Sequence, residues 1–110
     1  MEIKVSKKKG VIIMAIEGEI IVDTAMEMQY CFDDLLSKDE RNYVIDMSAV
    51  EHVDSSGLAA FVRLFKRVRF GKGDVKLCAL RHDVLKLFRI TRLDKVFDIF
   101  NDCSEALASF

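Results

Sequence analysis

A short apolar run near the middle of the chain constrains the fold more than any other feature. Residues 43–47 read Tyr-Val-Ile-Asp-Met and are apolar except for Asp46. A strand that is apolar without alternation is buried on both faces, which is typical of a parallel sheet covered by helices. The run therefore predicts an α/β architecture with this strand well inside the sheet.

Amphipathic segments alternate with further apolar runs along the rest of the chain. Apolar residues spaced three and four apart predict helices, and short β-branched runs predict strands. The expected helices begin at residues 23–24, after residues 54–57, at residue 83 and after residues 102–104, and the expected strands cover residues 3–6, 11–16, 43–47, 74–80 and 96–100. The expected core stripe of the second helix is Leu58, Phe61, Val62, Phe65 and Val68, with Gly71 at its end.

The order of these elements predicts one domain over residues 1–110. Gly10, after three lysines, suits the tight turn of an N-terminal hairpin. The fold class is α/β, with a mixed, mostly parallel sheet of about five strands packed by about four helices. No proline-rich or glycine-rich linker divides the 110 residues.

Composition excludes several classes of protein. The chain has 17 basic and 18 acidic residues, so its net charge is −1, and a general polyanion binder would be far more basic. Apolar residues make up 51%, which is too many for a disordered chain, yet no run is long enough to cross a membrane. The first residues contain no apolar signal region, and we therefore expect a cytoplasmic protein.

The cysteines and the basic residues allow simple interpretations. Cys31, Cys78 and Cys103 are odd in number and far apart, without CxxC spacing or a nearby histidine. We expect reduced cytosolic thiols, and neither a disulfide nor a metal site.

The basic cluster of the second helix and its end is either a solvated helix face or a docking surface. Its members are Arg63, Lys66, Arg67, Arg69 and Lys72.

The most informative motif follows the central strand. Asp54-Ser55-Ser56-Gly57 stands where the loop after the strand enters a helix. Free N–H groups and the positive dipole end make a helix N-terminus a natural place for a phosphate. A hydroxyl there is either a compact phosphate acceptor, or the motif does no more than cap the helix.

The motif and its surroundings resemble the STAS domain of bacterial anti-sigma factor antagonists. Residues 18–20 (Gly-Glu-Ile) resemble the segment after the hairpin in that family, residues 44–47 its central strand, and residues 54–58 its phosphorylation loop. Residues 77–80, 84–88 and 93–97 resemble its later strand, helix and strand in order and spacing. The resemblance covers nearly the whole chain.

This resemblance implies a partner switch and no enzymatic activity or cofactor of the chain's own. The unmodified antagonist binds an anti-sigma factor that is itself a serine kinase, and the sigma factor is released. The kinase then uses ATP to phosphorylate the first serine of the motif, here Ser55, and a metal-dependent serine phosphatase reverses the step. No direct contact with nucleic acid or membrane is implied.

The resemblance also implies roles for the neighbouring residues. Ser56 would help to cap the helix, Gly57 would let the partner approach, and Asp54 would shape the loop and offer its carboxylate. Leu58 is either partly exposed at the interface or part of the core stripe. These four, with Asp23 and Thr24, form the expected partner-binding set.

The chain departs from the family at two places. The family often has an aspartate directly after its Gly-Glu-Leu segment, where this chain has Ile21. Asp23 either replaces that acid from a shifted turn or only caps the helix. The family commonly has Ser-Pro at the third helix, and here Asp83 is the expected cap.

Other functions fit the residues less well. A serine hydrolase would need a GxSxG elbow, and His52 is poorly placed as a base for Ser55. A receiver domain would need an acidic pair after its first strand, and residues 71–74 lack the spacing of a phosphate-binding P-loop. The alternative within the same fold is a STAS adaptor subunit of a transporter or signalling scaffold, which does not switch.

Overall fold

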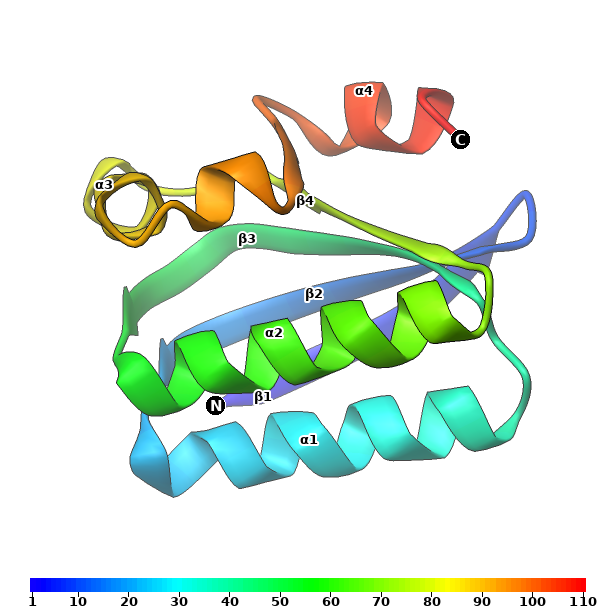
Figure 1. The fold of residues 1–110 in the computed structure, drawn as a ribbon, viewed down its shortest axis with the longest axis horizontal. Helices are drawn as coiled ribbons and strands as arrows, with labels where there is room; N and C mark the ends of the chain where they lie inside the picture. Colours follow the sequence, from blue (N-terminus) through cyan, green and yellow to red (C-terminus); the bar gives the residue numbers. More distant parts are fainter.

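All the expected strands lie in one five-stranded sheet in the computed structural model, which describes residues 1–110 (Figure 1). The first two strands pair antiparallel and every later pair is parallel, in the order of the chain. The strands are β1 (Glu2–Lys8), β2 (Val11–Ile20), β3 (Asn42–Val53), β4 (Asp74–Cys78) and β5 (Asp98–Phe100). The helices are α1 (Val22–Ser37), α2 (Ser55–Phe70), α3 (His82–Ile90) and α4 (Cys103–Ala108), with a 3₁₀ turn at Leu93–Lys95. The predicted fold class is confirmed.

The hairpin between β1 and β2 closes through a two-residue turn. Lys9 and Gly10 both have positive φ values, 54° and 79°. Two left-handed residues in succession give the turn whose twist matches paired strands. The lysines of this turn and of β1 also lie at the edge of the sheet, where charge discourages pairing with another chain.

The two faces of the sheet are covered unequally. Helices α1, α2 and α3 pack on one face and share a core cluster of 23 buried residues with the strands. Tyr43, Ile45 and Met47 of β3 point into this cluster and are fully buried. The other face is covered by α4, in a cluster of four buried residues that includes Val44 and Cys78. Figure 1 shows α1 and α2 side by side, with α4 beyond β3 and β4 on the other side.

The core stripe of α2 differs in part from the prediction. Leu58, Phe61 and Val68 are buried as expected. Leu64 and Ala60 complete the buried face, whereas Val62 and Phe65 are only partly buried. Leu64 lies four residues before Val68 on the same side of the helix, and this row faces the sheet more directly than Val62 and Phe65.

Gly71 ends α2 as predicted, whereas the start of α3 differs from the prediction. Gly71 ends α2 with an ordinary φ of −80°, and the left-handed residue of this turn is Lys72. Asp83 does not cap α3, which begins one residue earlier at His82, after Arg81, without a side-chain cap. Helix α4 begins in the expected region at Cys103, and Asp102 caps it by accepting a hydrogen bond from the backbone N of Glu105 at 2.8 Å.

The expectation for the cysteines is wrong for one pair. Cys78 at the end of β4 and Cys103 at the start of α4 form a disulfide, with their Cα atoms 5.2 Å apart. They are 25 residues apart in the sequence, and the return of the chain through β5 brings them together. Cys31 is a free thiol, as expected. None of the helices has both the length and the apolar character needed to span a membrane.

Candidate functional site

The candidate site lies where the loops after β2 and β3 meet. Ile20 and Val53, the last residues of these strands, are register partners. The backbone N of Asp54 donates to the carbonyl oxygen of Ile20 at 3.1 Å. Because both strands are followed at once by a helix, the N-termini of α1 and α2 lie side by side at this edge of the sheet (Figure 1).

Asp54 connects the two helices. Its Oδ1 accepts a hydrogen bond from the backbone N of Gly57 at 3.0 Å, which caps α2. Its Oδ2 accepts from the backbone N of Val22 at 3.1 Å, in the first turn of α1. One carboxylate therefore satisfies a free donor on each helix and meets the positive end of both dipoles.

The role expected for Gly57 is wrong. A β-carbon at this position would lie 2.5 Å from the carbonyl oxygen of Ile20, and 2.8 Å and 2.9 Å from the side chains of Val53 and Ile20. The missing side chain therefore lets α2 pack closely on the ends of β2 and β3. Gly57 is buried and does not open a path for a partner.

The two serines of the motif have different surroundings. Ser55 is the first residue of α2, is exposed, and its hydroxyl has no hydrogen-bond partner within the chain. Ser56 is half-buried and faces α1 across a groove. The expected capping role of Ser56 is wrong, because Asp54 provides the cap.

Thr24 and Asp23 lie in the first turn of α1. The Thr24 hydroxyl donates to the carbonyl oxygen of Glu19 at 2.6 Å and accepts from the backbone N of Ile21 at 3.0 Å, so the chain itself uses this group. Asp23 is exposed and forms no ion pair or hydrogen bond within the chain. Neither residue stands at the cap position, which Ile21 occupies, so the interpretation of Asp23 as a plain cap is wrong.

Leu58 belongs to the core. Its residue surface is 9% exposed, and it packs in the cluster under α2. Of its two interpretations, the structure supports the core stripe. The side chain holds the start of α2 on the sheet and offers a partner almost no surface.

A groove between α1 and α2, which the sequence pattern did not predict, adjoins the motif. The groove has a volume of about 330 Å³. The exposed side chains of Val22 and Met26, at 67% and 62%, form one of its walls. Its lining residues are Val22, Ala25, Met26, Gln29, Ser56, Ala59 and Arg63. The signal was present in the sequence, since Val22, Met26 and Tyr30 form a second apolar row on α1, away from its core face.

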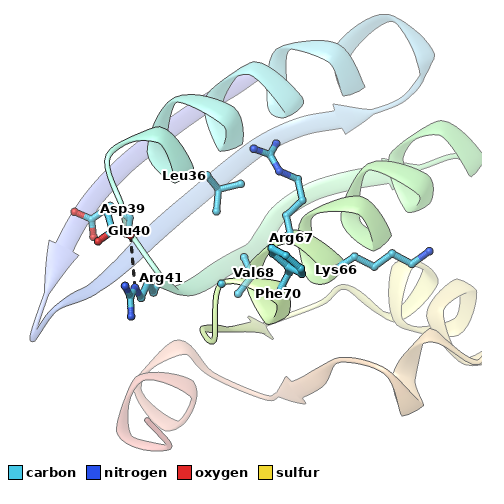
Figure 2. Close-up of a pocket in the computed structure, with 9 residues that line it drawn as sticks. Leu36, Asp39, Glu40, Arg41, Lys66, Arg67, Val68 and Phe70 are labelled. Carbon is cyan, nitrogen blue, oxygen red and sulfur yellow. Dashed lines mark ion pairs between the residues drawn. The ribbon is translucent and has the colours of Figure 1, made fainter.

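The largest depression lies at the opposite ends of the same helices. Figure 2 shows Leu36 and Phe70 among charged side chains from the ends of α1 and α2, around a volume of about 400 Å³. Because α2 has 16 residues, this depression lies roughly 24 Å from Ser55.

Charges in and around this depression are largely paired within the chain. Arg41 lies 3.6 Å from Asp39 (Figure 2). Arg67 pairs with Asp33 on α1. Arg69 lies 3.5 Å from Asp74. These pairs favour the solvated-face interpretation of the basic residues.

No catalytic arrangement surrounds Ser55. Both His52 and His82 are exposed, and neither forms a hydrogen bond with the serine. The site is an exposed serine hydroxyl at a helix N-terminus, with a groove beside it.

Comparison with known proteins identifies the family. Residues 2–106 match the STAS domain, so the chain belongs to the STAS family. The resemblance stated from the Asp-Ser-Ser-Gly motif is thereby confirmed. Within the family the chain is similar to the anti-sigma factor antagonists, which are binding proteins rather than enzymes.

Two relatives illustrate the similarity. BtrV of Bordetella bronchiseptica, whose name assigns it to the anti-sigma factor antagonists, is 26% identical over 110 residues, which is 100% of this chain and 95% of that protein. The anti-sigma-B factor antagonist of Listeria monocytogenes is 31% identical over 86 residues, which is 78% of this chain and 75% of that protein.

Solved structures have the same fold. The Thermotoga maritima protein TM1081, also named as an anti-sigma factor antagonist, matches with a TM-score of 0.93 at 24% identity, covering 97% of this chain and 92% of that one. The phosphorylated form of SpoIIAA, a Bacillus cell fate determinant, matches with a TM-score of 0.77 at 12% identity, covering 98% of each chain.

Proposed function

We propose that this chain is an anti-sigma factor antagonist that is switched by phosphorylation of Ser55. The observation that carries the proposal is the exposed Ser55 hydroxyl, which no group of the chain binds, at the first position of α2. Membership of the STAS family and the phosphorylated form of SpoIIAA, a protein of the same fold, support it.

The helix N-terminus favours a modification that leaves the fold intact. A phosphate on Ser55 adds about −1.5 to −2 charges and three acceptor oxygens. The first N–H groups of α2 and its dipole stabilise that charge. Two backbone donors hold the carboxylate of the neighbouring Asp54 in place. A phosphate on Ser55 therefore adds negative charge beside a fixed negative charge, in the surface that a partner would cover.

The unmodified face suits a protein partner. Asp23 and Ser55 are exposed close to the groove formed by Val22, Met26 and their neighbours. In our proposal the anti-sigma factor packs an apolar side chain into this groove and binds the Asp23 carboxylate, which takes the place of the family acid absent at Ile21. Asp54, Ser56 and Thr24 support this surface from within.

The partner supplies the chemistry. An anti-sigma factor with serine kinase activity provides the base and the Mg·ATP that phosphorylate Ser55, and a metal-dependent serine phosphatase removes the phosphate. The antagonist needs no cofactor and acts in the cytoplasm together with the sigma factor. Binding of unmodified antagonist to the kinase releases the sigma factor.

The test compares Ser55→Ala and Ser55→Asp, with Ser56→Ala as the matched control. The serine kinase anti-sigma factor of the same host is the probe, and calorimetry measures its affinity. We expect Ser55→Ala to bind as tightly as the wild type and to resist phosphorylation, whereas Ser56→Ala should still be phosphorylated as the wild type is. A desolvated extra charge costs several kcal/mol, so Ser55→Asp is expected to bind about a thousandfold more weakly.

Three results would contradict the switch. Equal binding of Ser55→Asp and wild type would show that the charge does not reach the interface. Phosphorylation of Ser56 instead of Ser55 would show that Ser55 is not the residue that accepts the phosphate. If no serine kinase binds and the chain instead copurifies with transporter or scaffold subunits, the adaptor function replaces the switch.

A further inference from the structure

Three chemically soft or acidic groups meet on the face of the sheet that the proposed switch does not use. Cys78 ends β4, Cys103 begins α4, and Asp46 lies on the neighbouring strand β3. One ligand atom from each, the two Sγ atoms and a carboxylate oxygen, lie within 4.8 Å of one another. They come from three separate elements, so no ligand spacing is visible in the sequence.

The oxidation state of Cys78 and Cys103 decides whether this cluster can bind a metal. In the oxidised form the two sulfurs are joined and have no thiolate to offer. A thiol reductant transfers two electrons to the disulfide, and two protons complete the two thiols. In a reducing cytoplasm, which the proposed function requires, the reduced form is the expected one.

We propose that the reduced Cys78–Cys103 pair and Asp46 form a binding site for a thiophilic divalent cation of the Zn²⁺ type. The two thiols release their protons as two metal–sulfur bonds form, and the Asp46 carboxylate provides the third ligand. Water completes a tetrahedral coordination shell. Binding of the metal and formation of the disulfide exclude each other.

The geometry around the cluster fits this ligand set. Zinc–sulfur bonds of about 2.3 Å place two sulfurs about 3.8 Å apart around a tetrahedral metal. The Cα separation of 5.2 Å accommodates that distance through side-chain rotation, without a shift of the backbone. The backbone N of Ser48 donates to Asp46 Oδ1 at 3.0 Å, which orients the carboxylate and leaves Oδ2 free for the metal.

Burial and softness select the kind of cation. Cys78 is fully buried, and Cys103 and Asp46 are half-buried, so an ion here is shielded but accessible. Thiolates favour zinc and other soft cations over magnesium or calcium, which prefer oxygen ligands. The metal would hold α4 on β3 and β4 in place of the disulfide.

The test uses Co²⁺ as a spectroscopic substitute for Zn²⁺. Wild-type protein is reduced with a phosphine, freed of reductant without air, and titrated with Co²⁺. We expect a thiolate-to-cobalt charge-transfer band that saturates at one metal per chain and disappears when Zn²⁺ is added. Oxidised protein should show no band, and this comparison needs no variant.

Three variants assign the ligands, with circular dichroism as the check of folding. Cys103→Ser should abolish the band, and Asp46→Asn should weaken binding about tenfold or more. Cys31→Ser is the matched control, because Cys31 is the free thiol on α1, and it should bind as the wild type does.

Several results would overturn the site. These are reduced wild type without a band, a band that survives Cys103→Ser, a band that Cys31→Ser removes, or unchanged affinity in Asp46→Asn.

Discussion

Replacement of Asp54 by alanine should destabilise the domain more than the loss of an ordinary helix cap. One carboxylate caps α2 through Gly57 and also accepts from Val22 at the start of α1. Loss of an N-cap costs about 1 kcal/mol. Loss of a second, charge-assisted hydrogen bond costs about 1 kcal/mol more at this partly exposed position.

The expected loss of unfolding free energy in Asp54→Ala is therefore about 2 kcal/mol. For a domain of this size that corresponds to roughly 10 °C in the unfolding midpoint. Asp54→Asn keeps one acceptor oxygen instead of two and should lose about half as much. Urea unfolding, followed by circular dichroism, measures both values.

Asp102→Ala provides the matched control. Asp102 caps α4 through a single bond to the backbone N of Glu105. Its loss should cost about 1 kcal/mol or less, because α4 is short and its end is exposed. If Asp54→Ala is no more destabilised than Asp102→Ala, or if Asp54→Asn equals the wild type, the idea of a shared cap is refuted.

Three further predictions follow from other positions. Gly57→Ala should lower the free energy of unfolding, measured in urea, by about 1–3 kcal/mol, because the new β-carbon meets a backbone carbonyl. In the control Gly71→Ala the new β-carbon makes only ordinary contacts at 3.6 Å, so the free energy of unfolding should fall by less than about 0.5 kcal/mol. Burial raises the pKa of Tyr43 to about 12, so the folded state holds this proton more tightly than the unfolded state. Stability should therefore fall between pH 10 and 12, by at most about 3 kcal/mol, and Tyr43→Phe should lack this part of the loss in alkaline unfolding curves. Met26→Asp, in the groove wall, should weaken binding of the anti-sigma factor kinase about 10- to 100-fold, with unchanged stability; unchanged affinity would exclude the groove from the interface.

The strand and helix pattern was predictable because it depends on short-range periodicity. The continuous apolar run at residues 43–47 correctly predicted a strand buried on both faces, and α1 and α2 begin and end close to the expected positions. The geometry of the turn that follows α2 was not predicted. Gly73 lies so close to the Arg41 backbone that a β-carbon would overlap its carbonyl oxygen, and this long-range contact sets the turn.

The candidate site was predictable only in its outline. The motif indicated the helix start and the exposed Ser55. The second hydrogen bond of Asp54 joins residues 32 positions apart, and the groove joins two helices, so neither follows from local spacing. The pairing of Cys78 with Cys103 was missed for the same reason, because it depends on where β5 returns the chain.

The unequal covering of the sheet has a consequence for how the molecule opens. Helix α4 has six residues and buries only Ala106 fully, whereas α2 contributes five buried residues to the main core. Backbone amides of α4 should therefore exchange with solvent deuterium through local opening, whereas those in the middle of α2 should exchange only when the whole domain unfolds. The disulfide or metal link at Cys103 would then decide how often α4 detaches from the sheet. It would not change the exchange rates of the slowest amides in the core.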